Sequence, residues 1–154
     1  MEFTRGVRPE DPVQMIMMWP VATVEGGASL SEAAEELAAD DVGALLVLEH
    51  GVLVGVVSER DVVRHIAEHA NPDHLDVRDL MTVDVVSAAP DDSILEVAHS
   101  LLNAGVRHLP VLQAGMIAGM VSARDVLGVL ADAIDRGGDV LVVDSGTRLV
   151  VRAR

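Results

Sequence analysis

The apolar and polar positions of this chain follow one pattern twice. Residues 13–66 align with residues 77–130 at a constant shift of 64 positions and without a gap, and 18 of these 54 pairs are identical. Identity at a third of ungapped positions indicates a duplication, so we interpret the chain as a tandem repeat. An element that the pattern predicts in one copy is therefore expected at the shifted position in the other.

Each copy predicts the same succession of elements. In the first copy, an apolar run at 21–24 predicts a short strand, and a capping box beginning at Ser29 opens a stretch of helical spacing. Apolar runs at 44–48 and 52–57 around a tight turn predict a β-hairpin, and a second helix is expected to begin at Ser58. The corresponding positions of the second copy are 85–88, Ser93, 109–112, 116–121 and Ser122.

The buried sides of the two second helices are assigned from helical spacing. An apolar stripe with positions three and four apart is expected to face the core. The residues that we place on these buried sides are Val62, Val63, Ile66, Val126, Leu127 and Leu130.

The order β-α-β-β-α, written twice, predicts an α+β fold made of two small units. Half of the residues are apolar, but the aromatic residues are only Phe3 and Trp19, so the core is expected to be aliphatic. Strand-forming residues on both sides of Ser145-Gly146 predict an appended C-terminal β-hairpin. We divide the chain into an N-terminal arm at 1–12, a first repeat at 13–68, a linker at 69–76, a second repeat at 77–132 and a C-terminal extension at 133–154.

Composition excludes several classes of partner. The formal charge is −14, from 25 acidic residues against 11 arginines with no lysine or cysteine, and a surface of that sign repels nucleic acid. The near absence of aromatic residues also argues against stacking on single-stranded bases. The apolar patch at 15–19 ends at Pro20 and is too short for a signal sequence or a membrane span. We expect a cytoplasmic protein that contacts neither nucleic acid nor a membrane.

The candidate site residues lie where each hairpin runs into its second helix. The motif from Gly55 to Asp61 recurs from Gly119 to Asp125, with Ser58 and Arg60 matching Ser122 and Arg124. In one interpretation the Ser and the Asp only cap a helix. Capping requires neither the Arg nor the Gly, however. A helix N-terminus with Ser and Arg binds phosphate, and an Asp one turn in accepts ribose hydroxyls, so the motif also suits a nucleotide.

The two copies differ just before the hairpin. The second copy has Arg107-His108 where the first has Gly43-Ala44. Beside Arg124 this pair would make a local positive pocket in an acidic protein, and the alternative is a solvated pair at a strand start. The spacing of His65 and His69 is compatible with a metal, but no carboxylate or cysteine completes a set, so we predict no metal site.

With these motifs the chain resembles a CBS-domain pair, also called a Bateman module, over residues 13–132. The resemblance rests on a methionine before each first strand, the repeated Gly-to-Asp motif, and the segment from Arg107 to Val111. It implies two repeats packed about a pseudo-twofold axis, with clefts between them for AMP, ADP, ATP or S-adenosylmethionine as regulatory ligands. No cofactor is required. The family usually senses ligands and does not catalyse reactions.

The resemblance also implies roles for individual residues. Asp61 and Asp125 would bind ribose, and Ser58, Arg60, Ser122 and Arg124 would lie near phosphate. The residues that would border the adenine or reach into a cleft are Val21, Thr23, Val85, Ser87, Arg107, His108 and Pro110. We expect the Asp125 cleft to be the better equipped of the two.

Three functional hypotheses follow. The first is a regulatory module that binds an adenosyl nucleotide and signals to an effector protein, and its apolar second helices also suggest a homodimer. The second is a structural or interaction module in which the Ser and Asp residues are only caps. The third is an enzyme, for which the sequence offers no arrangement of reacting groups.

Overall fold

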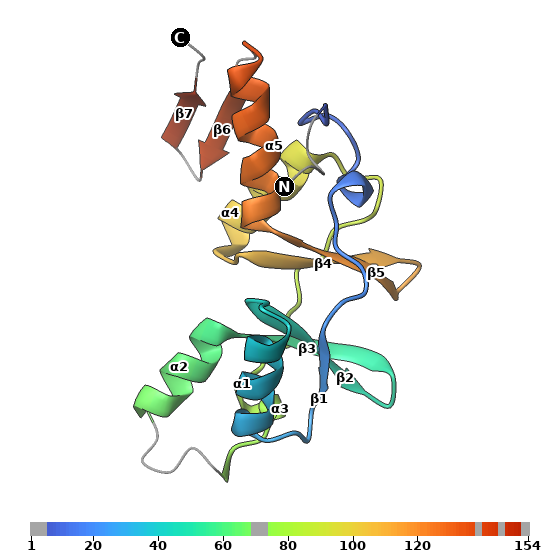
Figure 1. The fold of residues 1–154 in the computed structure, drawn as a ribbon, viewed down its shortest axis with the longest axis vertical. Coiled ribbons are helices and arrows are strands. Elements are labelled where there is room, and N and C mark those ends of the chain that lie inside the picture. The colour runs from blue at the N-terminus through green and yellow to red at the C-terminus, as the bar shows by residue number, and fades with distance from the viewer. Residues whose placement is uncertain (1–5, 69–73, 138–139, 145–146, 152–154) are drawn as a thin grey trace. The chain divides into compact units, whose positions relative to one another are not determined.

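The computed structural model describes residues 6–68, 74–137, 140–144 and 147–151 (Figure 1). The chain divides into two compact units. We call Pro20–Val85 the first-repeat unit, and Met1–Trp19 together with Val86–Arg154 the second-repeat unit. The predicted α+β fold with tandem repeats is confirmed, and no helix among the described residues is long and apolar enough to cross a membrane.

The first-repeat unit is a three-stranded sheet with helices packed on it. β1 (Thr23–Glu25) runs parallel to β2 (Ala44–Glu49), which pairs antiparallel with β3 (Val52–Ser58). The helices are α1 (Leu30–Ala39), α2 (Glu59–Glu68) and α3 (Val77–Leu80). The core is aliphatic, as predicted, and consists of Val24, Leu30, Ala33, Leu37, Leu45, Val47, Val57, Val62, Val77 and Leu80.

The second-repeat unit follows the same plan with a two-stranded sheet in place of the three-stranded one, and it adds the predicted C-terminal hairpin. β4 (His108–Gln113) pairs antiparallel with β5 (Met116–Ser122), and β6 (Val140–Asp144) pairs antiparallel with β7 (Thr147–Val151). Its helices are a short 3-10 turn η1 (Val13–Met15), α4 (Ile94–Ala104) and α5 (Ala123–Asp135). The core contains Val7, Val13, Ile16, Ala88, Ile94, Val97, Ala98, Leu101, Leu109, Val111, Val121, Val126, Val129 and Leu130.

The capping boxes predicted at the starts of α1 and α4 are present. Ser29 Oγ accepts from the N–H of Glu32 over 3.2 Å, and Ser93 Oγ accepts from that of Glu96 over the same distance. Hydrogen bonds from the backbone and hydroxyl of Ser29 lower the pKa of Glu32 below 4.5, and those from the hydroxyl and backbone of Ser93 lower that of Glu96. The pKa of each glutamate is therefore lower in the folded protein than in the unfolded chain. The stabilisation from each cap is fully present above the pKa of the unfolded chain, and it is lost as the pH falls through the pKa of the folded protein.

The two predicted hairpins form with the same tight turn. His50 and Gly51 have φ of 51° and 79°, and Ala114 and Gly115 have φ of 50° and 79°. Two successive positive φ values are those of a type I′ turn, whose twist matches that of the paired strands. Glycine at the second position adopts this conformation without steric cost, which explains why Gly51 recurs as Gly115.

The first strand of the second copy is shorter than predicted. Val85, Val86 and Ser87 form no strand, and only Ala88 makes a bridge, to Val111. In the first copy the N–H of Leu46 donates to the carbonyl of Ala22 over 3.1 Å. Its counterpart is Pro110, which has no N–H to donate, so this ladder bond is lost and the parallel pairing ends early.

The prediction for the second helices is correct for only part of each stripe. Val62, Val126 and Leu130 are buried. Val63, Ile66 and Leu127, which we also placed on the buried side, have exposed fractions of 66%, 53% and 63%. One small sheet covers a single narrow stripe of each helix, so the neighbouring apolar positions stay at the surface.

Each unit is completed by the segment that begins the other repeat. We call residues 13–18 and 77–82 the lead segments. The first lead segment pairs with β5 in the second-repeat unit, where Met18 and Met120 exchange backbone hydrogen bonds of 2.7 and 3.1 Å. The second pairs with β3 in the first-repeat unit, where Val56 and Thr82 exchange bonds of 3.1 and 2.9 Å. The repeats seen in the sequence are therefore not the packed units.

Part of the segment that we predicted to be an N-terminal arm belongs to the same packing. Val7 is buried in the second-repeat core, and its carbonyl accepts from Arg136 Nη2 over 2.8 Å. The N–H groups of Leu95 and Ile94 donate to the carbonyls of Pro9 and Asp11. These contacts bind the segment to α5 and to the beginning of α4.

Candidate functional site

Both Ser-Asp pairs lie where a hairpin strand becomes a helix. At the start of α2, Asp61 Oδ2 accepts from the N–H of Ser58 over 2.9 Å and from its hydroxyl over 2.6 Å. At the start of α5, Asp125 Oδ2 accepts from the N–H and hydroxyl of Ser122 over 2.8 and 2.6 Å. All four residues are half-buried. Each Ser-Asp pair therefore forms a capping box, and the remaining question is whether a carboxylate oxygen stays available for a ligand.

The strand that precedes the hairpin turn begins beside each helix start. In the second-repeat unit, His108 pairs with Ser122 across the β4–β5 ladder, and the N–H of Ala123 donates to the carbonyl of Arg107 over 2.8 Å. In the first-repeat unit the same places hold Ala44, opposite Ser58, and Gly43, whose carbonyl accepts from Glu59. The Arg-His pair thus lies next to the serine of the second motif.

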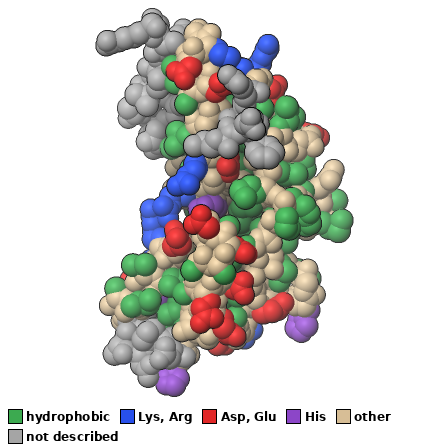
Figure 2. Space-filling view, viewed as in Figure 1, with side chains coloured by type: hydrophobic (Ala, Val, Ile, Leu, Met, Phe, Trp, Pro, Cys, Tyr) green, Lys and Arg blue, Asp and Glu red, His purple; other side chains and the backbone are tan. Residues whose placement is uncertain are grey.

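The second helix start is the more positive of the two. Arg107 and Arg124 are exposed, and neither makes an ion pair within the part of the chain that the structure describes. The first helix begins with Glu59 where the second has Ala123, and so carries one more negative charge. Figure 2 shows acidic side chains scattered over the face that it presents and basic side chains confined to a few places. Two exposed arginines without an ion pair to a described residue make the α5 start unusual in such an acidic chain.

The residues predicted to border the adenine are divided between the units. Val21, Thr23 and Val85 belong to the first-repeat unit, together with Arg60 at the start of α2. Ser87 belongs to the second-repeat unit, where it is exposed and precedes the bridge from Ala88 to Val111. Of the pair Val85 and Ser87, only Ser87 therefore shares a unit with Asp125. Pro110 also lies in that unit, and it is buried in β4.

The glycine of each motif, which capping does not require, has a packing role. A Cβ atom on Gly55 would lie 2.6 Å from Sδ of Met81, and one on Gly119 would lie 2.7 Å from Sδ of Met17. These distances are shorter than real Cβ atoms show, so a side chain at either position forces at least the methionine to move. The glycine and the methionine of the motif are therefore packing partners in the fold.

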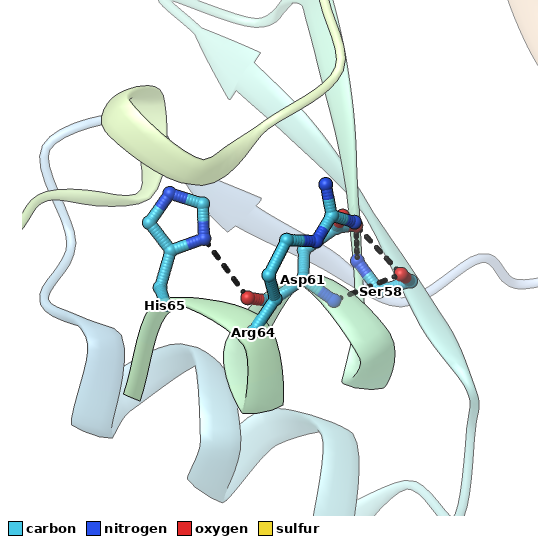
Figure 3. A network of polar contacts seen from close by, with 4 residues as sticks. All are labelled: Ser58, Asp61, Arg64 and His65. Atoms are coloured by element: carbon cyan, nitrogen blue, oxygen red, sulfur yellow. Dashed lines mark hydrogen bonds and ion pairs between the residues drawn. The ribbon is translucent and has the colours of Figure 1, made fainter. Parts of the chain in front are cut away.

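The structure shows one polar residue near the first site that the sequence analysis did not single out. Arg64 Nη2 lies 2.7 Å from Asp61 Oδ1, and His65 Nδ1 lies 3.0 Å from the carbonyl of Asp61 (Figure 3). Asp and Arg three residues apart on a helix are neighbours, so the spacing alone contained this signal. At the equivalent positions the second copy has Gly128 and Val129. Among the described residues no group of three or more His, Asp or Glu side chains is arranged to hold a metal.

The chain matches a known protein family. The model of the CBS domain matches the chain twice, at residues 11–68 and 77–132. The chain is 31% identical over 121 residues to the uncharacterized protein MJ1225 of Methanocaldococcus jannaschii, a match that covers 78% of this chain and 43% of that protein. The chain thus spans less than half of that relative's length.

Solved structures show the same fold. The CBS-domain containing protein ATU1752 from Agrobacterium tumefaciens is 29% identical with a TM-score of 0.73, and the match covers 79% of this chain and 94% of that one. The CBS domain pair of protein MJ0100, in complex with 5′-methylthioadenosine and S-adenosyl-L-methionine, is 25% identical with a TM-score of 0.73, over 80% of this chain and 98% of that one.

Proposed function

Because the chain belongs to the CBS-domain family, with one domain in each repeat, we propose that this regulatory module binds an adenosine-containing ligand at the start of α5. AMP, ADP, ATP and S-adenosylmethionine are the candidates. The observation that carries the proposal is the setting of Asp125: Arg124 precedes it in the helix, the carbonyl of Arg107 accepts from the N–H of Ala123, and neither arginine makes an ion pair with a described residue. The complex of MJ0100 with two adenosyl compounds supports the ligand class.

Each group at this helix start has a role in the proposed complex. The positive end of the α5 dipole favours phosphate, and the two arginines neutralise its charge. S-adenosylmethionine has no phosphate, so the charge of the tail discriminates between candidates: two arginines favour AMP, ADP or ATP. Asp125 accepts the ribose hydroxyls through its Oδ1. Ligand occupancy is then signalled to a partner protein.

Replacing Asp125 with asparagine is expected to weaken binding of AMP about 10- to 100-fold, because a hydrogen bond to a charged group contributes about 1.5–3 kcal/mol. Isothermal titration measures the change. Asp135→Asn is the matched control, since it makes the same substitution at an exposed position in the last turn of the same helix. Flat titrations of the unmodified protein with all four candidate ligands would refute the proposal.

The exposed apolar residues on the second helices favour a second role, self-association. Val63, Ile66 and Leu127 are large side chains more than half exposed. We therefore propose a homodimer formed through α2, α5 or both. Val63→Glu, Ile66→Glu and Leu127→Glu combined should halve the mass measured by light scattering at micromolar concentration. If the chain is only such an interaction module, Ser122→Ala lowers its melting temperature, but no nucleotide raises it.

A further inference from the structure

The two aspartates that are proposed to bind ribose differ in the contacts of one carboxylate oxygen, Oδ1. In both, Oδ2 accepts two hydrogen bonds from the preceding serine. Asp61 Oδ1 is 2.7 Å from Arg64 Nη2, whereas Asp125 Oδ1 has no hydrogen bond or ion pair with any described residue. Figure 3 shows Arg64 reaching back from the second turn of α2 to this carboxylate.

The difference follows from a single position in the duplicated sequence. Residue 64 is arginine, and its counterpart 64 positions later is Gly128, which has no side chain to reach Asp125. Both positions lie three residues after the aspartate, where a helical side chain meets it. The hydrogen bonds between the serine and the aspartate do not distinguish the copies, because they agree within 0.2 Å.

Counting lone pairs shows why this contact matters for a ribose. A carboxylate has about four acceptor sites, two on each oxygen. The serine fills both sites of Oδ2 in each copy. A vicinal diol that donates two hydrogen bonds then needs both sites of Oδ1. In Asp125 both sites lack a partner among the described residues, but in Asp61 Arg64 takes one of them.

We propose that Arg64 biases the nucleoside toward the second repeat: it occupies one acceptor site of Asp61 at the first helix start, so the ligand binds preferentially at Asp125. This inference rests on the proposed function. Its expected size is modest, because the arginine side chain is 52% exposed and an ion pair of that kind is cheap to open. Removing Arg64 should tighten binding at Asp61 about two- to fivefold.

The test is a site-resolved NMR titration with adenosine, and then with AMP. Adenosine has the diol but no phosphate, so it reports the acceptor without the charge of Arg64. In the unmodified protein, adenosine should shift the amide signals of Ser122 to Asp125 at lower concentration than those of Ser58 to Asp61. In the Arg64→Ala variant, the amide signals of Ser58 to Asp61 should respond at two- to fivefold lower adenosine concentration than in the unmodified protein. 2′,3′-Dideoxyadenosine should show no such gain.

Arg78→Ala is the matched control. The Arg78 side chain is 51% exposed, close to the value for Arg64, and it lies in the same unit. Its ion pair is with Glu49, at 3.0 Å, and does not involve Asp61. This variant should leave both sets of signals as they are. The reciprocal change, Gly128→Arg, should weaken adenosine binding at Asp125 two- to fivefold relative to Gly128→Ala, which controls for the effect on the helix.

Three results would overturn the inference. If Arg64→Ala titrates like Arg78→Ala while adenosine still binds at Asp125, Arg64 excludes nothing and the proposed function stands. If Arg64→Ala weakens AMP but leaves adenosine unchanged, Arg64 is a phosphate contact. If no variant responds to either compound, the proposed function fails and this inference fails with it.

Discussion

Replacing Val13 with aspartate is expected to unfold the second-repeat unit, although Val13 belongs to the first repeat of the sequence. Its side chain is fully buried in the core that contains Leu109 and Val121. An unpaired charge in such a place costs about 3–5 kcal/mol, a large part of the ~5–15 kcal/mol that stabilises a domain. Val77→Asp should have the mirrored effect, because Val77 is buried with Leu45 and Val57 in the first-repeat unit.

Hydrogen–deuterium exchange distinguishes the two units. Val13→Asp should expose the amides of β4 and β5 first, and Val77→Asp those of β2 and β3. Met15→Asp is the control, since Met15 is 51% exposed and the second copy already has Asp79 there. Faster exchange in β2 and β3 after Val13→Asp would mean that each lead segment stabilises its own repeat.

Replacing Gly119 with valine is expected to destabilise the second-repeat unit by about 1–3 kcal/mol, the range found for overpacked cores. The added Cβ would lie 2.7 Å from Met17 Sδ and 3.1 Å from the carbonyl oxygen of Met18. The methionine side chain can move, but the carbonyl of Met18 accepts from the N–H of Met120, so shifting it disturbs the strand pairing. Chemical denaturation of Gly119→Val measures the loss.

A double-mutant cycle with Met17→Ala tests the named contact. Shortening Met17 removes the sulfur contact and leaves the carbonyl contact, so it should recover part of the loss and give a coupling energy of about 0.5–3 kcal/mol. Gly27→Ala is the control, because its Cβ would meet only Arg78 Nη2, at 3.8 Å. Strict additivity between Gly119→Val and Met17→Ala would show that the methionine is not what excludes a side chain there.

Local patterns predicted the elements well because the relevant interactions join residues that are close in the sequence. The capping boxes at Ser29 and Ser93 span three residues, and the hairpin turns at Gly51 and Gly115 span two. The cause of the shortened strand before Ala88 is visible in the sequence, since Pro110 cannot donate a ladder bond. The effect of Pro110 depends on which strand pairs with it. The sequence alone does not identify that partner, so the loss of the hydrogen bond could not be inferred.

Packing partners could not be predicted in the same way. The alignment of the repeats pairs Val13 with Val77, but it does not show which core each of them joins, and two homologous sheets offer equivalent places. For the same reason Val63, Ile66 and Leu127 could not be separated from their buried neighbours. At the candidate site, the Asp61–Arg64 spacing was visible, yet only the distance of 2.7 Å shows that the pair forms.

The crossed placement of the lead segments has a consequence for how such a chain arises. In a single ancestral repeat, the edge of the hairpin would be unpaired. The lead segment of that repeat would be unpaired as well. Two separate copies would satisfy both by domain swapping, so the ancestor would fold only as a pair and would fall apart on dilution. Joining the copies end to end places each partner at an effective concentration in the millimolar range. Gene fusion would thereby make folding independent of protein concentration.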